Sequence, residues 1–461
     1  MKRPNIILLI ADQLRYDCVG AAELNAINTP NLDRLAGEGM FFEHAFTPMP
    51  VCAPARQCLA SGRMADSFGA FWNYDMGGLP CKSMSGGDTW SNRLYQSGYN
   101  TAFLGKWHSS ETHGAGDFGY GHVVGNGEWQ SYVDSKYPGR KYEGGWHGEP
   151  SFLELADSHA HYMSAKASEL LHRFSREDKP FFLRIDYNDP HPRYLPSAPF
   201  SEMYDPRDLS PWPSFGDTFE GKPYIQKQMV VNWDNEGKSW DEWSQTVARY
   251  YGFVSQLDAA VGTVLNAAAQ TGQDDNTVVI FTSDHGDTCG GHGMFDKHYV
   301  LYDDNCRVPL IIRFPDMGTG GQRCGAFVSN MLDLVPTIEE LCGLEPSGER
   351  HGLSLVPLLK GEAQPERDNF AVSSSNGQQF GFFSNRSIRT PGWRYVWNLT
   401  DVDELYDHNA DPGELCNLAA DPGYADTLSE LRLMLYDKLI TYDDPFAKGW
   451  VSKQLTESRK I

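Results

Sequence analysis

The hydrophobic positions of the chain fall into two patterns that alternate along its first 350 residues. A short continuous apolar run, typical of a strand buried on both faces, occurs at residues 5–11, and residues 40–42, 101–104, 181–187, 277–282 and 308–314 also read as strands. Helical spacing occurs between these runs at residues 28–36, 88–96, 160–174, 243–269 and 333–341. This alternation predicts an α/β fold in which helices cover both faces of a large, mostly parallel sheet.

Two segments of this region show no clear period. Residues 110–150 are rich in Gly, His, Trp and Tyr, and residues 195–235 are rich in Pro. We expect long loops there, which in α/β enzymes often form the walls of a site. Ligands of such sheets bind beyond the carboxyl ends of the strands.

The pattern changes after residue 360. Residues 361–368 form a polar link that contains Pro365. Beyond it, residues 370–372, 380–384 and 394–398 read as strands of a small antiparallel sheet, and residues 425–440 read as a helix. We therefore predict a catalytic domain at 1–360 and a smaller C-terminal α+β subdomain at 361–461.

Charge narrows the range of partners. The 461 residues carry a formal net charge of −22, which disfavours nucleic acid and anionic membrane surfaces. A long polyanion would be repelled as well, so an anionic substrate should be small and held by a local basic pocket. No apolar run approaches the roughly 18 to 20 residues that a membrane span needs. The sequence leaves the oligomeric state open.

The cysteines and the N-terminal residues indicate the cellular compartment in which the protein resides. The nine cysteines show no CxxC pair and no metal-finger spacing, which fits a reducing compartment. The apolar run at residues 6–11 is short and is interrupted by Asp12, so we read it as a strand and not as a signal peptide. The expectation is a cytoplasmic protein, or a periplasmic or secreted one if a leader has been removed.

The chemistry centres on one short stretch, Cys52-Ala53-Pro54-Ala55-Arg56. Pro54 suits a first helical turn and Gly62 suits a helix end, so we predict a short helix that begins just after Cys52. An anion would meet free N–H groups and the positive end of the helix dipole there. Arg56, one turn on, is expected to project back to the same place. A reactive thiol and an anion cradle would then share one turn.

Two strand ends carry pairs of possible metal ligands, Asp12-Gln13 and Asp284-His285. Hard cations take several oxygen ligands, and adjacent parallel strands would bring both pairs to one point. Either pair alone is more often a helix cap. Together with Cys52 they predict a divalent metal site.

Further motifs occur in a fixed order along the chain: Gly105-Lys106-Trp107-His108, Pro190-His191, Lys297, Asp333-Leu334-Val335-Pro336-Thr337 and Glu404-Leu405-Tyr406-Asp407. With Cys52-x-Pro54-x-Arg56 and the two metal-like pairs, they resemble the type I, formylglycine-dependent sulfatases of the alkaline-phosphatase-like superfamily. The resemblance covers nearly the whole chain and is weakest at residues 110–150 and 195–235.

The resemblance implies a hydrolase that converts a sulfate ester, of a sugar or of another small molecule, to an alcohol and inorganic sulfate. Cys52 would be oxidised to formylglycine by a formylglycine-generating or sulfatase-maturating enzyme, and its hydrate would be the nucleophile. Arg56, Lys106 and Lys297 would stabilise the charge that develops in the transition state. His191 would protonate the leaving alcohol and His108 would act as the base that expels sulfate. Substrate contacts are implied for Lys106, His191 and Lys297.

The metal pairs depart from the commonest pattern of that family, Asp-Asp followed by Asp-Asn, because Gln13 is neutral and His285 offers nitrogen. Ca²⁺ remains the expected ion, with Mg²⁺ or Mn²⁺ as alternatives. Two other functions stay open. A phosphonate monoester hydrolase or phosphodiesterase on the same scaffold is suggested by Gln13 and His285, although such enzymes tend to lack Lys106 and His108. A catalytically silent binding protein would keep Cys52 as a thiol.

Overall fold

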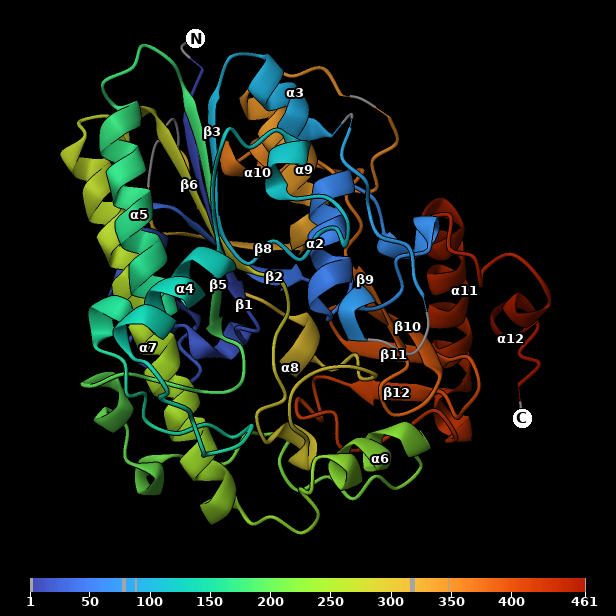
Figure 1. The fold of residues 1–461 in the computed structure, drawn as a ribbon. Coiled ribbons are helices and arrows are strands. Elements are labelled where there is room, and N and C mark those ends of the chain that lie inside the picture. Colours follow the sequence, from blue (N-terminus) through green and yellow to red (C-terminus); the bar gives the residue numbers. More distant parts are fainter. Residues whose placement is uncertain (1–2, 77–79, 88, 316–319, 347, 461) are drawn as a thin grey trace.

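The computed structural model describes residues 3–76, 80–87, 89–315, 320–346 and 348–460 (Figure 1). Its large sheet has eight strands in the order β4-β3-β5-β1-β6-β7-β2-β8. The strands are β1 (Asn5–Asp12), β2 (Met40–Phe46), β3 (Asn100–Gly105), β4 (His122–Gly125), β5 (Phe181–Pro190), β6 (Thr277–Ser283), β7 (Leu310–Arg313) and β8 (Gln322–Ser329). Within the described ranges β7 alone runs antiparallel to its neighbours, so the predicted mostly parallel sheet is confirmed.

Alternate residues of β1 enter two separate hydrophobic cores, which explains why its sequence is an unbroken apolar run. Ile7 and Leu9 pack on one face, and Ile6 and Leu8 on the other. The first face is covered by α1 (Pro30–Glu38), α5 (His159–Phe174) and α7 (Trp240–Gln270). The second is covered by α2 (Cys52–Ser61), α3 (Trp90–Gln96), α9 (Asn330–Leu341) and α10 (Val356–Leu359). Figure 1 shows α5 and α7 on one side of the strands and α2, α3 and α9 on the other.

Strand pairing brings the polar strand ends to one edge of the sheet. Strand β1 lies between β5 and β6, and β3 pairs with β5. Gly105, the last residue of β3, lies opposite Asp186 and has φ +96°. A Cβ at position 105 would lie 2.0 Å from the Asp186 carbonyl oxygen, so glycine is needed for the chain to turn toward Lys106.

The two segments expected to be long loops also contain regular structure, which corrects the sequence expectation. Residues 110–150 include β4 and α4 (Asn126–Lys136), and residues 195–235 include α6 (Tyr224–Asn232). Helix α4 buries only Val133, so it has too little apolar surface to produce a helical period. Strand β8 was not predicted. Most of its residues are partly or fully exposed at the edge of the sheet, which removes the continuous apolar signal.

The C-terminal residues form a four-stranded antiparallel sheet and a helix, as predicted. The sheet order is β12-β11-β10-β9, from β9 (Ala371–Gly377), β10 (Phe383–Arg389), β11 (Trp393–Asn398) and β12 (Glu404–Asp407). Helix α11 (Ala425–Thr441) packs on β10 and β11 (Figure 1). The short helices α8 (Asp303–Cys306) and α12 (Lys453–Thr456) complete the main elements. The strand expected at 380–384 begins later, at Phe383.

The C-terminal sheet is tied to the large sheet by direct bonds. Ser373 Oγ donates to the Thr47 carbonyl at 2.6 Å, and the Ser374 N–H donates to the Pro48 carbonyl at 2.9 Å. One hydrophobic cluster contains residues from both parts, including Ile10, Leu59 and Leu435. The boundary at residue 360 stays a prediction.

Two remaining features concern the chain as a whole. All nine cysteines are unpaired. Of the helices formed by the described residues, none combines the length and the apolar character that crossing a membrane requires.

Candidate active site

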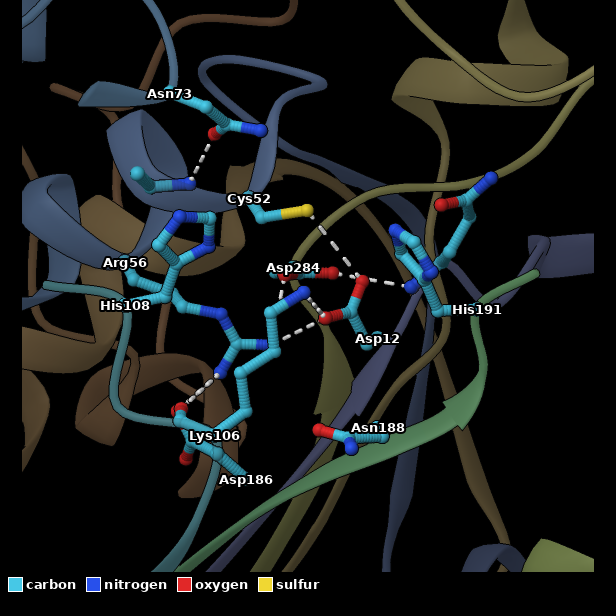
Figure 2. A network of polar contacts seen from close by, with 12 residues as sticks. Asp12, Cys52, Arg56, Asn73, Lys106, His108, Asp186, Asn188, His191 and Asp284 are labelled. Atoms are coloured by element: carbon cyan, nitrogen blue, oxygen red, sulfur yellow. Dashed lines mark hydrogen bonds and ion pairs between the residues drawn. The ribbon is translucent and has the colours of Figure 1, made fainter. Parts of the chain in front are cut away.

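Cys52 is the first residue of α2, with Val51 at the N-cap. Pro54 occupies the first turn and Gly62 ends the helix with φ 72°, as the sequence predicted. The Cys52 side chain is 1% exposed, and Figure 2 shows its sulfur pointing toward the Asp12 carboxylate at 3.6 Å. The next N–H of the helix, on Ala53, donates to Asn73 Oδ1 at 2.9 Å. The predicted reactive side chain therefore lies at a helix N-terminus above the end of β1.

Arg56 holds carboxylates together beneath Cys52. Its guanidinium is fully buried and lies 3.2 Å from Asp12 Oδ2 and 2.8 Å from Asp284 Oδ2. It also pairs with Asp186 (Figure 2). The sequence led us to expect this guanidinium beside a bound anion, whereas three acidic side chains of the protein occupy it. Its predicted catalytic role stays a prediction.

Lys106 reaches the same carboxylate from the turn after β3. Its Nζ lies 2.5 Å from Asp12 Oδ2, and the side chain is 20% exposed (Figure 2). Burial lowers the pKa of Lys106, but the negative charges of Asp12 and Cys52 outweigh burial and raise the pKa above its usual value. Lys106 is therefore charged and borders both the buried carboxylates and the pocket.

The Cys52 thiol sits in a strongly positive environment. Burial raises its pKa, but Lys106, Lys297 and His285 outweigh burial and hold the pKa well below the usual range. The free thiol would therefore be a thiolate. The same positive charges would favour any anionic group bound at this position.

Four side chains form a cluster suited to a divalent cation. Asp12, Cys52, Asp284 and His285 each offer one ligand atom, and these atoms lie within 4.8 Å of one another. All four residues are buried. Asp284 Oδ2 has no hydrogen-bond partner, although it forms the ion pair with Arg56. A buried carboxylate oxygen without a donor fits a cation.

The orientation of His285 also suits a ligand. Its Nδ1 lies 2.8 Å from the Gly286 carbonyl, which only accepts, so Nδ1 carries a proton. Its Nε2 lies 3.2 Å from the Cys52 sulfur. Burial lowers the pKa of His285, but Asp284 and Cys52 outweigh burial and raise it to about 9. The excess of negative charge that raises this pKa is what a metal ion would neutralise.

Gln13, a predicted metal ligand, bonds to other side chains in this structure, and its role as a ligand stays a prediction. Its Nε2 donates to Asp287 Oδ2 at 2.9 Å and to Asp296 Oδ1 at 2.8 Å. Its Oε1 accepts from Lys297 Nζ at 2.6 Å. The side-chain amide is thus engaged with a neighbouring acidic pair and a lysine, and the predicted role as a ligand lacks support from these contacts.

The remaining predicted residues line the pocket above Cys52. Lys297 Nζ lies 2.6 Å from His191 Nε2, and His191 Nδ1 lies 2.6 Å from the Pro192 carbonyl. Opposing contributions act on Lys297: burial lowers its pKa, and Asp296 and Cys52 raise it to a net value above normal. Lys297 is thus a charged donor directed at His191.

His108 is oriented by an acidic residue. Its Nε2 lies 3.2 Å from Asp75 Oδ1, and its Nδ1 is buried without a hydrogen-bond partner. Burial lowers the pKa of His108, but the contact with Asp75 raises it above the usual value. An orienting carboxylate on one ring nitrogen and a free nitrogen on the other is the arrangement of a general base.

The pocket that contains these groups has a volume of about 600 Å³. Cys52, Lys106, His108, His191 and Lys297 all line it. Aromatic side chains form much of its rim: Tyr74, Trp107, Trp146 and Trp233. The structure therefore gathers five predicted residues from distant parts of the chain into one cavity, while their catalytic roles stay predictions.

Several residues of the site were not predicted. Asn73 accepts the Ala53 N–H, Asp75 contacts His108, and Asp186 pairs with Arg56. Asp287 and Asp296 accept hydrogen bonds from the Gln13 amide. Asp287 and Asp296 lie near Lys297 in sequence, and Asp186 ends the apolar run of β5, so position relative to a motif was an available signal. Asn73 and Asp75 lie in a segment without a pattern, and only tertiary contacts reveal them.

Comparison with known proteins gives a consistent result along the whole chain. A family model described as "Sulfatase" matches residues 4–344. A second model, "N-sulphoglucosamine sulphohydrolase, C-terminal", matches residues 290–440. The "Uncharacterized sulfatase YidJ" of Escherichia coli K12 is 30% identical over 97% of this chain and 89% of its own length. An arylsulfatase of Clostridium perfringens is 28% identical over 97% of this chain and 96% of its own length.

Solved structures share the fold. The phosphonate monoester hydrolase of Silicibacter pomeroyi superposes with a TM-score of 0.83 at 22% identity, over 96% of this chain and 97% of its own. A putative sulfatase of Bacteroides thetaiotaomicron superposes with a TM-score of 0.78 at 24% identity, over 97% and 95%. At such identities the likeness concerns the fold alone.

Proposed function

The chain belongs to the sulfatase family, within the alkaline-phosphatase-like superfamily, and from this premise we propose that it hydrolyses a small sulfate ester at residue 52 with the help of a divalent metal. As a member of that family it is a sulfuric ester hydrolase. The observation that supports the choice of residue 52 is its position. Cys52 begins a helix, belongs to the candidate metal cluster and lines a pocket that contains two lysines and three histidines.

The two lysines give the pocket its affinity for sulfate. Lys106 and Lys297 line the pocket together with Cys52, and both are protonated because neighbouring negative charges raise their pKa. A sulfate ester is monoanionic and gains charge on its leaving oxygen in the transition state. Donors placed before the reaction stabilise that charge without reorganising. Lys106 and Lys297 thereby bind the ester and lower the barrier.

A metal ion would be held by Asp12, Asp284 and His285, together with residue 52. When bound, such an ion supplies positive charge to the sulfate oxygens and to the nucleophile. In this structure Arg56 pairs with both Asp12 and Asp284 and so holds the two carboxylates close together. The four side chains of the cluster include one imidazole, and the Gln13 amide bonds to other residues in this structure, so the cluster offers fewer oxygens than the roughly six to eight that Ca²⁺ takes. We therefore expect Mn²⁺ to bind at least as well as Ca²⁺.

Two histidines divide the proton transfers. His191 would protonate the leaving oxygen through Nε2, and the charged Lys297, whose Nζ lies 2.6 Å from that nitrogen, would supply the proton. His108, oriented by Asp75, has Nδ1 free for a proton from residue 52. As formylglycine hydrate, residue 52 would supply a nucleophilic hydroxyl and a second hydroxyl for this base. That modification requires a maturation enzyme as a transient partner.

The substrate is proposed to be a sulfated sugar or a similarly small ester. Relatives named N-acetylglucosamine-6-O-sulfatase and Delta 4,5-hexuronate-2-O-sulfatase, both of Bacteroides thetaiotaomicron, are each 26% identical over 96% of this chain. The aromatic rim of the pocket, which includes Trp146 and Trp233, suits the apolar face of a sugar ring. The negative net charge argues against a long sulfated polymer.

One substrate panel tests this proposal. Purified protein matured in a host with a sulfatase-maturating enzyme is assayed for kcat/KM on an aryl sulfate, sulfated monosaccharides, a phenyl phosphonate monoester and a phosphodiester. The expected result is a clear preference for sulfate esters, together with the mass change of Cys52 oxidation to an aldehyde. Preference for the phosphorus esters would favour a phosphonate monoester hydrolase instead. Absence of the mass change and of all turnover from the matured protein would favour a silent binding protein.

A further inference from the structure

A second cavity opens beside the active-site pocket, and no role has so far been given to it. Its volume is about 310 Å³, within the range of small-molecule sites. The two cavities share Lys106, Asn126, His191 and Pro192 in their linings. The second cavity is therefore continuous with the first on the side of His191. We call it the side pocket.

The side pocket contains a buried carboxylate with one oxygen that has no hydrogen-bond partner. Asp189, near the end of β5, is 1% exposed, and its Oδ1 has no hydrogen-bond partner. Its Oδ2 lies 3.3 Å from His159 Nδ1. That nitrogen already accepts the Asn188 N–H at 3.2 Å, while His159 Nε2 faces Asn126 Oδ1 at 2.9 Å. A nitrogen that accepts carries no proton for Asp189. Asp189 Oδ1 is thus left without a donor, which costs a buried carboxylate free energy.

The same cavity contains a buried donor without an acceptor. Gln256, in α7, is fully buried and its Nε2 has no partner. The orientation of its amide is fixed, because its Oε1 accepts the Ser197 N–H at 2.7 Å. Asp189 and Gln256 thus present one unfilled acceptor and one unfilled donor to one cavity.

This pairing identifies the chemistry of the missing partner. An ammonium group only donates, and a carboxylate or sulfate only accepts, so neither would satisfy both side chains. A hydroxyl group donates and accepts. The other walls include Trp129, Leu153, Leu195 and Phe253, which suit the apolar C–H face of a ring. The cavity is therefore complementary to a neutral ring that carries hydroxyl groups.

We propose that the side pocket binds a hydroxyl-bearing sugar ring in the alcohol part of the substrate, with Asp189 accepting from and Gln256 donating to its hydroxyls. The inference rests on the proposed function, because it places the leaving oxygen at His191, from which the side pocket extends. Asp189 and Gln256 are then residues that determine specificity and take no part in the chemical step.

The first test measures binding and does not depend on turnover. The full chain with unmodified Cys52 is titrated with D-galactose, L-fucose, N-acetyl-D-glucosamine and, separately, choline, with saturation-transfer NMR as the readout. At least one sugar should bind. Asp189→Asn and Gln256→Leu should each weaken it about tenfold. The matched control is Asp134→Asn, an exposed residue of α4, which should bind as wild type does. Binding of choline alone, of no probe, or equally by all variants would overturn the assignment.

The second test separates recognition from structure. On a sulfated monosaccharide, both variants should lose about tenfold in kcat/KM, whereas on para-nitrophenyl sulfate, which lacks hydroxyls, they should match wild type. The melting temperature of Asp189→Asn should equal or exceed that of wild type, because an unpaired buried charge is removed. Equal losses on both substrates, or a lowered melting temperature, would indicate a structural role and overturn the proposal. If wild type hydrolyses neither ester, the proposed function fails while the binding test still decides the side pocket.

Discussion

At the scale of single residues, the site shows how buried charge is tolerated. Asp12 is fully buried, and burial raises its pKa, but Lys106, His191 and Arg56 outweigh burial and keep the carboxyl ionised. Asp284, a few ångströms away, has a raised pKa because of burial and the neighbouring Asp12. Asp12 is thus stable as an anion in this environment, whereas a bound cation would stabilise the ionised form of Asp284.

The first prediction concerns the nucleophile position. Cys52→Ala should lower kcat by on the order of 10⁴-fold or more, because no other group of the pocket can take its place. Its thermal unfolding should match wild type. The matched control is Cys58→Ala, the same substitution at a second buried cysteine of α2. Cys58 does not line the pocket, so this variant should retain activity. Substantial sulfatase activity in Cys52→Ala would contradict a covalent role for residue 52.

The second prediction concerns the metal. Chelation should abolish activity, and added Mn²⁺ or Ca²⁺ should restore it. Asp284→Ala should lose bound metal, as measured by inductively coupled plasma mass spectrometry, because it removes one of the two carboxylates of the cluster. Asp304→Ala, an acidic residue outside the cluster, serves as the control. If Asp284→Ala retains one metal ion per chain and normal turnover, the ion is bound elsewhere.

At the scale of elements, one buried carboxylate joins two helices. Asp258 of α7 caps the start of α1: it accepts from the N–H groups of Asn31 and Leu32 at 3.1 and 2.8 Å. The side chain is 1% exposed, and burial raises its pKa to about 6 despite these bonds. Helix capping and charge burial therefore oppose each other at this contact.

This conflict predicts a pH dependence of stability. Because the pKa of Asp258 in the folded state, about 6, exceeds the usual aspartate value of 3.8, the folded state binds the proton more tightly than the unfolded state does. The stability that this proton contributes is present below about pH 4 and is lost as pH rises through 6. Between these limits the free energy of unfolding of wild type should fall relative to Asp258→Asn by about 2 to 3 kcal/mol. Urea unfolding of both proteins measures the difference. A constant difference across this window would show that Asp258 titrates normally.

At the scale of the whole molecule, a buried ion network connects the C-terminal sheet to the first part of the chain. Arg386 of β10 is fully buried and pairs with Asp66 at 3.0 Å and with Asp444 at 2.6 Å. Asp66 precedes residue 360 and Asp444 follows α11, so three distant segments meet at one guanidinium. Removing the guanidinium leaves two carboxylates buried without their cation.

Arg386→Met should therefore lower the free energy of unfolding by about 3 to 5 kcal/mol. The control is Arg207→Met, whose ion pair with Asp205 is exposed to solvent and should contribute little to the free energy of unfolding. Urea unfolding followed by fluorescence and by circular dichroism gives both values. Coincident transitions would show that the two predicted domains unfold together. If Arg386→Met lowers the free energy of unfolding by less than about 1 kcal/mol, the ion network does not stabilise the contact between them.

The sequence by itself determined the parts of this protein that depend on local pattern. The unbroken apolar run of β1 indicated a strand buried on both faces, and β5 and β6 were also recognised as strands, although β5 includes Arg184 and Asp186. Pro54 and Gly62 determined the limits of α2 because each has a restricted or unusual backbone preference. Cys52, Asp12 and Asp284 were found since they stand at fixed offsets from these elements.

The tertiary structure decided which of these ends meet and what the side chains bond to. The order β5-β1-β6 results from the packing of the whole sheet, and no residue of β1 encodes it alone. Gln13 shows the limit most clearly: its position beside Asp12 suggested a ligand, yet its amide bonds to Asp287, Asp296 and Lys297, far along the chain. A buried polar group takes whichever partner satisfies it, and for long-range partners that choice exists only once the chain has folded.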